Sequence, residues 1–215
     1  MSLAAAEVDR LQAFAALLLE ANKHVNLTSA RTLEAIWGHI EDSLSVAPYL
    51  AEGELIDVGS GGGFPAIPLA IVSGVRITLV EAIGKKAAFL RAALDELGLA
   101  GEVVVGRAES VGHAPAQRER YATATARAVA SAPAVLEMTL PLLRVGGRAV
   151  LQRGRLDEAE RRAVEAAAPM LGGAAPREQL LAGERRLLVV EKSAPTPVRF
   201  PRRVGVPERK PLCFT

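Results

Sequence analysis

Cysteine and aromatic residues are scarce in this chain, and long apolar runs are missing. Cys213 is the single cysteine among 215 residues, so the chain cannot form an internal disulfide, which fits a reducing compartment. Aromatic residues make up 4% of the sequence, so alanine, leucine and valine must fill most of the core. No apolar run approaches the ~18 residues that a membrane span requires, and the N-terminus does not resemble a signal peptide. We therefore expect a soluble, cytoplasmic protein without a membrane partner.

Charge is nearly balanced overall but is unevenly distributed. The formal net charge is +2, from 26 basic and 24 acidic residues. Residues 1–52 carry 3 basic and 7 acidic side chains, net −4, whereas residues 193–215 carry 5 basic and 1 acidic side chain, net +4. This asymmetry points to an anionic partner on the basic side, although a merely solvated tail has the same composition.

Two predicted helices precede the first predicted strand. Apolar residues at helical spacing predict helices over residues 7–21 and 31–47, joined by the loop NKHVNLTSA. We interpret residues 1–52 as an N-terminal helical appendage, residues 53–192 as the main domain, and residues 193–215 as a basic, proline-rich C-terminal tail. Because proline interrupts helices, we expect this tail to be extended.

Strand and helix patterns alternate through the main domain. Apolar segments predict strands at residues 54–58, 76–81, 102–106, 121–127, 147–153 and 185–192. Helical spacing predicts helices at residues 64–72, 84–99, 131–143 and 155–171. This alternation is typical of an α/β fold, in which helices cover both faces of a parallel sheet.

The stretch LIDVGSGGGFPA, residues 55–66, places four glycines within five positions between a predicted strand and a predicted helix. Glycines there let the backbone approach a ligand closely, next to the free N–H groups of the helix. The dinucleotide fingerprint G-x-G-x-x-G fails at Phe64, and a phosphate-binding loop would need a lysine after Gly63. The pattern D-x-G-x-G-x-G instead resembles the first motif of S-adenosylmethionine (SAM) methyltransferases, with Asp57, Gly59, Gly61 and Gly63 as its residues.

An acidic residue follows at the end of the second predicted strand. Glu81 lies 24 positions after Asp57, and a carboxylate at this place can accept hydrogen bonds from both hydroxyls of a ribose. The alternative is an ordinary surface acid at a strand end. Beside the glycine loop, we favour the cofactor-binding interpretation.

Six further segments make the resemblance more specific. They are NLTS at 26–29, HIEDSL at 39–44, GKKAAFL at 84–90, GRAES at 106–110, ARAVAS at 126–131, and the tail RFPRRVGVPERKPL. With DVGSGGGFP at 57–65, they closely resemble the RsmG (GidB) family of 16S rRNA guanine-N7 methyltransferases over nearly the whole chain. The resemblance implies a Rossmann-like SAM-dependent methyltransferase fold, with a mostly parallel seven-stranded sheet and helices on both faces. It also implies SAM as cofactor and 16S rRNA, or the small ribosomal subunit, as partner.

The resemblance implies roles for individual residues. Gly59 and Phe64 match cofactor contacts in the first loop, and Ala108 and Glu109 match the segment that borders the adenine. Arg127 matches the family's site arginine, which is expected to grip RNA or to order the SAM carboxylate. A structural ion pair is an equally good interpretation of Arg127.

Three positions depart from the family pattern. Glu81 stands where an aspartate is usual, which keeps the carboxylate but lengthens its reach. Ala66 replaces the glycine of Phe-Pro-Gly. Arg153 and Gly154 replace Lys-Gly, which changes the shape of an expected RNA contact.

The basic tail is predicted to bind RNA phosphates. Its charges on an extended segment would add a salt-dependent term to RNA affinity. The competing interpretation is a tail that packs back on the domain through Pro211, Leu212 and Phe214. The tail residues predicted to bind RNA are Arg199, Arg202, Arg203 and Lys210.

Guanine N7 carries a lone pair and no proton, so its methylation needs no general base. Positioning can then supply most of the rate enhancement. The sequence agrees, because no cysteine lies near the glycine loop and no metal-ligand cluster is visible. His39 and Asp42, three positions apart, are interpreted as a brace between helices. The alternatives are a methyltransferase for a small molecule and a non-catalytic nucleotide- or RNA-binding module; we expect a monomer.

Overall fold

Seven strands form one sheet in the computed structural model, which describes residues 3–181 and 183–213. The strand order is β3-β2-β1-β4-β5-β7-β6. Strands β1 to β5 are parallel to one another, whereas β7 is antiparallel to β5 and β6. The strands are β1 (Leu55–Val58), β2 (Ile77–Glu81), β3 (Gly101–Val105), β4 (Tyr121–Arg127), β5 (Leu143–Arg153), β6 (Arg177–Leu180) and β7 (Arg186–Glu191).

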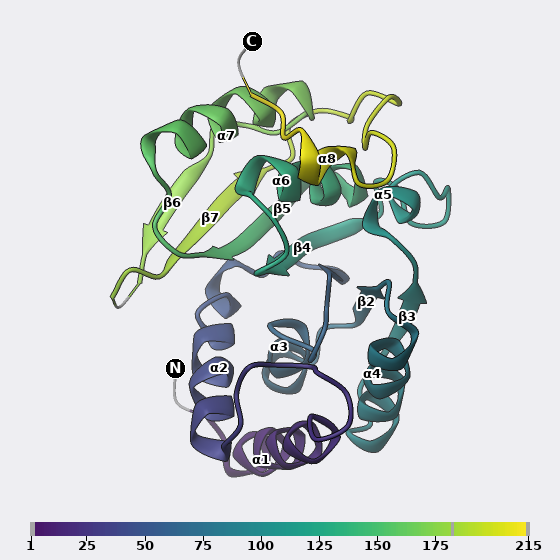
Figure 1. Cartoon of the computed structure of the whole chain (residues 1–215), viewed down its shortest axis with the longest axis vertical. Coiled ribbons are helices and arrows are strands. Elements are labelled where there is room, and N and C mark those ends of the chain that lie inside the picture. The colour runs from purple at the N-terminus through teal and green to yellow at the C-terminus, as the bar shows by residue number, and fades with distance from the viewer. Residues whose placement is uncertain (1–2, 182, 214–215) are drawn as a thin grey trace.

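Helices cover both faces of the sheet, as the sequence predicted (Figure 1). One face carries α1 (Ala5–Ala21), α2 (Leu33–Leu44), α3 (Ala66–Ser73) and α4 (Gly84–Glu96). The other carries α5 (Ala108–Val111), α6 (Ala132–Thr139), α7 (Glu158–Met170) and α8 (Val206–Arg209). Two short 3-10 turns, η1 (Ala47–Tyr49) and η2 (Leu140–Leu142), complete the described elements. No helix among the described residues is long and apolar enough to cross a bilayer.

Two hydrophobic clusters lie on opposite faces of the sheet because side chains alternate along each strand. In β1, Leu55 belongs to the cluster under α1–α4, whereas Ile56 and Val58 belong to the cluster under α5–α8. In β7, Leu187 and Leu188 divide in the same way. Both faces of the central strands are therefore buried, which explains their continuous apolar sequences.

The order of the strands reverses between β1 and β4. From β1 the chain proceeds outward to β2 and β3, then crosses back to add β4 on the other side of β1. In such sheets a crevice forms at the carboxyl ends of the strands, at this switch point, and ligands bind there. The glycine loop follows β1 at this edge.

Three local features differ from the sequence expectation. The helix expected to reach residue 143 ends at Thr139, because Pro141 cannot continue the hydrogen-bond ladder and a 3-10 turn follows. Strand β5 therefore begins at Leu143, four residues early. Strand β6 was missed because its four residues are exposed and three of them are polar, so it has no alternating pattern; pairing with β7 holds it.

The N-terminal helices share the core of the sheet domain. Leu11, Phe14 and Leu18 of α1 are fully buried in the cluster that also contains Leu55 of β1. The ring of Phe14 meets the ring of Phe64 edge-on, with 5.3 Å between centroids. The helices thus help to position the segment after the glycine loop, while the domain boundaries at residues 52 and 192 stay predictions.

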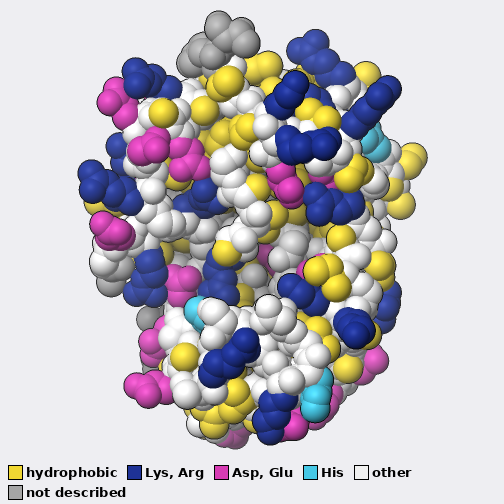
Figure 2. Space-filling view, viewed as in Figure 1, with side chains coloured by type: hydrophobic (Ala, Val, Ile, Leu, Met, Phe, Trp, Pro, Cys, Tyr) yellow, Lys and Arg dark blue, Asp and Glu magenta, His cyan; other side chains and the backbone are white. Residues whose placement is uncertain are grey.

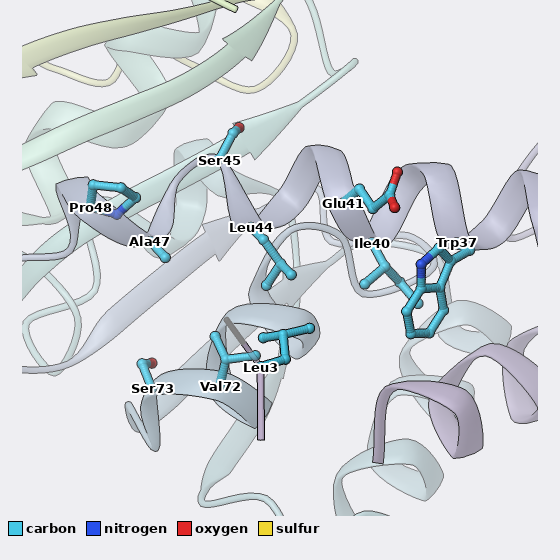
Figure 3. A pocket seen from close by; sticks show the side chains of 10 residues that line it. All are labelled: Leu3, Trp37, Ile40, Glu41, Leu44, Ser45, Ala47, Pro48, Val72 and Ser73. Atoms are coloured by element: carbon cyan, nitrogen blue, oxygen red, sulfur yellow. The ribbon is translucent and has the colours of Figure 1, made fainter. Parts of the chain in front are cut away.

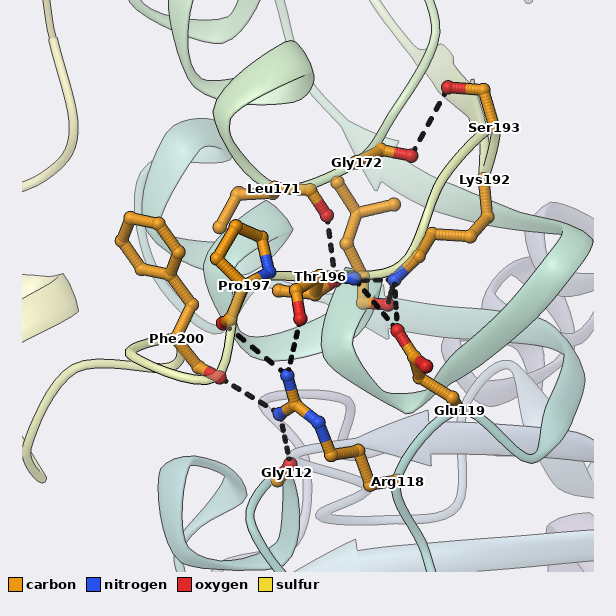
Figure 4. A network of polar contacts seen from close by, with 11 residues as sticks. Gly112, Arg118, Glu119, Leu171, Gly172, Lys192, Ser193, Thr196, Pro197 and Phe200 are labelled. Carbon is orange, nitrogen blue, oxygen red and sulfur yellow. Dashed lines mark hydrogen bonds and ion pairs between the residues drawn. The ribbon is translucent and has the colours of Figure 1, made fainter.

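A buried polar network fixes the start of the C-terminal segment (Figure 4). Lys192 is 1% exposed, and its Nζ donates to the carbonyl of Leu140 at 2.7 Å and to the hydroxyl of Thr196. Glu119 pairs with Nζ at 3.5 Å and accepts the backbone N–H of Thr196 at 2.7 Å. Burial lowers the pKa of Lys192 to about 8. The guanidinium of Arg118 adds bonds to the carbonyls of Thr196 and Phe200.

The tail packs on the domain, which corrects the expectation of an extended, free segment. Residues 206–209 form a short helix, and Phe200, Pro207 and Leu212 are buried. Arg202 donates to both carboxylate oxygens of Glu137, with a shortest distance of 2.6 Å, and Glu137 is completely buried. The guanidinium of Arg202 therefore takes part in an ion pair inside the fold. Of the apolar latch considered as the alternative, Leu212 is confirmed as buried, whereas Phe214 lies outside the described residues.

We predict that Arg202→Ala lowers the free energy of unfolding by about 3 kcal/mol, because removing one partner of a buried ion pair leaves the other charge uncompensated. Urea denaturation measures this. The neighbouring Arg203 is exposed, so Arg203→Ala serves as the matched control and should change stability by less than about 0.5 kcal/mol. Equal effects of the two substitutions would contradict the structural role of Arg202.

Candidate functional site

The glycine loop has a backbone that only glycine adopts without strain. Gly59, Gly61 and Gly63 have φ angles of +72°, +50° and +91°. A Cβ on Gly59 would lie 2.8 Å from Cγ2 of Val129, and one on Gly63 would lie 2.5 Å from Cδ1 of Ile67. At Gly61 a Cβ would lie 3.7 Å from the carbonyl oxygen of Leu27, which is an ordinary contact distance. Side chains are thus excluded at Gly59 and Gly63, and the loop presents its backbone to a cavity.

Glu81 holds the loop in this conformation. Its Oε2 accepts the backbone N–H of Gly61 at 3.0 Å, and its Oε1 accepts that of Ile83 at 2.8 Å. The residue ends β2, and only 6% of it is exposed. The structure therefore places Glu81, the residue predicted to bind the ribose, directly against the glycine loop. Its carboxylate connects the segments that follow β1 and β2.

Asp57 is a buried carboxyl beneath the loop. It is 0% exposed, its Oδ1 accepts the hydroxyl of Thr125 at 2.7 Å, and its Oδ2 has no hydrogen-bond partner among the described residues. Burial raises the pKa of Asp57 to about 7, although the bond from Thr125 acts in the opposite direction. Asp57 is therefore an internal support of the loop.

Arg127 reaches the same edge from the end of β4. Its guanidinium lies over the ring of Phe64, 4.6 Å from the centroid, and 3.7 Å from Oδ2 of Asp42 on α2. Burial lowers the pKa of Arg127 from its ordinary value. His39 meets the same ring edge-on at 5.5 Å, and burial together with the charge of Arg127 lowers its pKa. The side chains of His39 and Asp42 thus face Phe64 and the strand ends and belong to the site, whereas their expected role as a brace between helices stays a prediction.

A cavity of about 460 Å³ lies between these residues. It is lined by the glycine loop, Phe64 and Arg127 from the sheet side, and by His39 and Asp42 from α2. The loop between α1 and α2 closes it with Thr28 and Ser29. A ligand in this cavity would contact bare backbone, an aromatic ring and charges of both signs.

Asn22 shapes the loop that closes the cavity, and the sequence analysis missed it. Its Nδ2 donates to the carbonyls of Thr28 and Ala30, and its Oδ1 accepts the N–H groups of Leu27 and Thr28. All four bonds are 2.8–3.1 Å long and Asn22 is buried. The only sequence signal was its position at the end of a predicted helix, before NLTS.

Ala108 and Glu109 border a second, smaller cavity on the other side of Gly59. This cavity has a volume of about 50 Å³, and Val129 and Glu208 also line it. Glu109 is 1% exposed; its Oε1 accepts the N–H of Gly205 at 2.7 Å, while its Oε2 has no partner among the described residues. The C-terminal segment therefore contacts the predicted adenine border directly.

The residues predicted to bind RNA divide into paired and exposed groups. Arg153 donates to the carbonyl of Ala130 and to Glu160 at 2.8 Å, so it is paired within the fold, as Arg202 is, and its RNA contact stays a prediction. Lys and Arg side chains are spread around the face in Figure 2 rather than merged into one patch. The exposed tail residues are Arg199, Arg203 and Lys210.

The largest described cavity lies elsewhere. It has a volume of about 830 Å³ and lies between Leu3, α2 and the C-terminal end of α3 (Figure 3). Seven of its ten lining residues are apolar, including Trp37 and Leu44. It contains neither the glycine loop nor any basic group, so size does not identify the site here. The described residues also contain no group of three His, Cys, Asp or Glu side chains that could hold a metal.

Solved structures of low sequence identity share this fold. A 16S rRNA methyltransferase (RsmC) of T. thermophilus in complex with AdoMet and guanosine has a TM-score of 0.52 and 18% identity, covering 71% of this chain and 39% of that one. A geranyl diphosphate methyltransferase in complex with SAM has a TM-score of 0.56 and 15% identity, covering 71% and 85%. The fold is that of the SAM-dependent methyltransferases.

Sequence comparison narrows this class to one family. The family profile described as rRNA small subunit methyltransferase G (GidB) matches residues 7–189. Proteins named ribosomal RNA small subunit methyltransferase G are 44% identical in Rubrobacter xylanophilus, over 92% of this chain and 81% of the relative, and 46% identical in Chloroflexus aggregans, over 89% and 84%. The chain belongs to the rRNA small subunit methyltransferase G family, and it is an enzyme of the methyltransferase class.

Asp57 gives the site a testable pH dependence. Its pKa in the folded protein, about 7, lies above the ordinary value of 3.8, so folding favours the protonated form. The associated stability is complete below pH 4 and is lost as the pH rises to 7. Asp57→Asn cannot titrate, so its stability relative to the unaltered protein should rise between pH 4 and pH 7, by up to about 4 kcal/mol, and stay constant above.

Urea denaturation at several pH values measures this difference. The exposed Asp95 on α4 provides the control, because Asp95→Asn makes the same change from carboxyl to amide away from the site. A flat difference between Asp57→Asn and the unaltered protein would show that Asp57 is ionised in the fold throughout this range.

Proposed function

We propose that the protein transfers the methyl group of SAM to N7 of a guanine in 16S rRNA of the small ribosomal subunit. The observation that carries this proposal is the cavity at the switch point, where a bare glycine backbone meets Phe64 and Arg127. Membership in the family, and the names of relatives that cover most of the chain, support the rRNA substrate. The fold is compatible with action in the cytoplasm and as a monomer, which remain predictions.

The residues around Gly59 fit SAM in their chemistry. Gly59, Gly61 and Gly63 offer a backbone without side chains, and the aromatic ring of Phe64 lies beside them. Glu81 accepts an N–H of the loop, and at the smaller cavity, next to Ala108, Glu109 presents a buried oxygen that has no partner among the described residues. SAM, when bound, supplies an electrophilic methyl group. Asp57 is buried beneath the loop, and its part in cofactor binding stays a prediction.

Arg127 is positioned to orient groups in the cavity rather than to move protons. Its stacking on Phe64 and its ion pair with Asp42 fix the guanidinium at the cavity wall. Because guanine N7 has no proton to remove, holding the base and excluding water suffice for the reaction. A cation at this wall suits the carboxylate of the cofactor or a phosphate of the RNA.

Methylation by the purified protein tests the proposal directly. Labelled SAM is supplied with naked 16S rRNA, with assembled small subunits, or with a pool of small metabolites. We expect label in rRNA, and strand cleavage at the methylated position after borohydride and aniline, because N7-methylguanine carries a fixed positive charge that makes the RNA labile. Label only in metabolites would support a small-molecule enzyme instead, and SAM binding without transfer to any substrate would support a non-catalytic module.

Glu81 should contribute directly to SAM binding. We expect Glu81→Ala to weaken SAM affinity about 10- to 150-fold, as loss of one charge-assisted hydrogen bond of ~1.5–3 kcal/mol would. Isothermal titration calorimetry gives the affinity. Glu102→Ala on the neighbouring strand β3 is the control and should leave it unchanged, and a loss below twofold in Glu81→Ala would remove Glu81 from the cofactor site.

A further inference from the structure

A further polar cavity, here called the β5–β7 cavity, adjoins the cavity over the glycine loop on the side of β5 and β7. It has a volume of about 260 Å³ and shares Asp42, Arg127, Ala128 and Arg185 with the cavity over the glycine loop. Gln152 is part of its wall and does not line the first cavity. The two cavities therefore form adjoining compartments of one cleft, separated by Asp42 and Arg127.

The register of the sheet explains why these side chains meet. Gln152 of β5 lies directly opposite Arg127 of β4, so both side chains point to the face covered by α2. Asp42 of α2 lies above this pair. The backbone carbonyl and Oδ2 of Asp42 accept the amide N–H groups of Gln152 at 2.8 and 3.0 Å. The row Arg127–Gln152 and the carboxylate of Asp42 thus form one continuous polar wall.

The amide of Gln152 leaves one strong acceptor unused. Because its nitrogen donates twice to Asp42, its orientation is fixed, and its Oε1 must point away from that carboxylate. Gln152 is only 5% exposed, and its buried Oε1 has no hydrogen-bond partner among the described residues. A buried acceptor without a partner is unfavourable unless a ligand supplies the donor.

We propose that the β5–β7 cavity binds the target nucleobase and that Gln152 selects guanine by accepting a hydrogen bond from its exocyclic N2 amino group. The inference rests on the proposed rRNA methylation. Asp42, beside Gln152, accepts the neighbouring N1–H with its carboxylate. N7 lies at the opposite end of the purine from N1 and N2, so a base held in this way directs N7 toward the cavity over the glycine loop.

The chemistry of the bases makes this a specificity device. Adenine presents an acceptor at N1 and no amino group at C2, so it would offer no donor to Oε1 of Gln152 and would place a lone pair against the carboxylate of Asp42. Enzymes that modify a base extruded from its stack read it through its Watson–Crick edge in this manner. The guanidinium groups of Arg153 and Arg186 line the same cavity, and such planar groups stack on bases. Gln152 is accordingly a specificity residue, and Asp42 positions it.

A substrate lacking a single amino group tests the proposal. The target guanine, located by the cleavage assay, is replaced by inosine in a synthetic RNA, and kcat/KM is measured with labelled SAM. We expect the unaltered protein to prefer guanine by about tenfold, as loss of a donor to a buried acceptor implies. A guanine-to-inosine ratio near one in the unaltered protein would overturn the proposal and would leave the arginines as a site for an RNA phosphate.

Substitution of Gln152 completes the test. In Gln152→Met the ratio should fall to about one or two, because the acceptor is gone for both substrates. A merely structural role would lower both rates and preserve the ratio, and that result would overturn the proposal. Gln179→Leu on the exposed edge strand β6 is the matched control and should keep the original ratio. If Gln152→Met does not fold, Gln152→Asn, which withdraws the same oxygen, takes its place.

The test separates the inference from the proposed function. If the protein methylates no RNA at all, the proposed function fails. If it methylates guanine- and inosine-containing RNA at equal rates, the proposed function stands and only the role of Gln152 fails.

Discussion

The site depends on one constraint: the backbone after β1 must turn with positive φ angles where no side chain fits. Gly59 and Gly63 have no room for a Cβ against Val129 and Ile67, and Gly61 has its N–H held by Glu81. This turn places bare backbone at the carboxyl edge of the sheet, where the strand order reverses. The cavity, helix α3 after the turn and the contacts of the neighbouring strands are all arranged around this turn.

Arg127 connects this turn to the N-terminal helices. It stacks on Phe64, which follows the turn, and pairs with Asp42 of α2, so the cavity has a wall only because α2 is packed on the sheet. Phe14 of α1 supports the same ring from another side. The C-terminal segment has a comparable role at the smaller cavity, through the bond from Gly205 to Glu109. Both ends of the chain therefore complete a site whose centre lies in the sheet domain.

Local patterns in the sequence predicted the central elements well. Alternation and glycine content located β1, its loop and the acid at the end of β2, because these depend on neighbouring residues. Strand β6 was not predictable, since its exposed residues form a strand only by pairing with β7. The same limit applies to Arg202, Arg153 and Gln152. Their basic or polar character is visible in the sequence, but Arg202 and Gln152 have partners 65 and 110 positions away, and Arg153 bonds to a carbonyl 23 positions away as well as to Glu160.

Backbone NMR of the protein titrated with SAM tests most directly whether the glycine turn is the cofactor site. The account predicts that the largest amide shifts occur in residues 59–64, at Ile83 beside Glu81, and at Ala108 and Glu109, with Arg127 also affected. Shifts concentrated around Trp37 and Leu44 in the large apolar cavity, with the glycine turn unchanged, would contradict it.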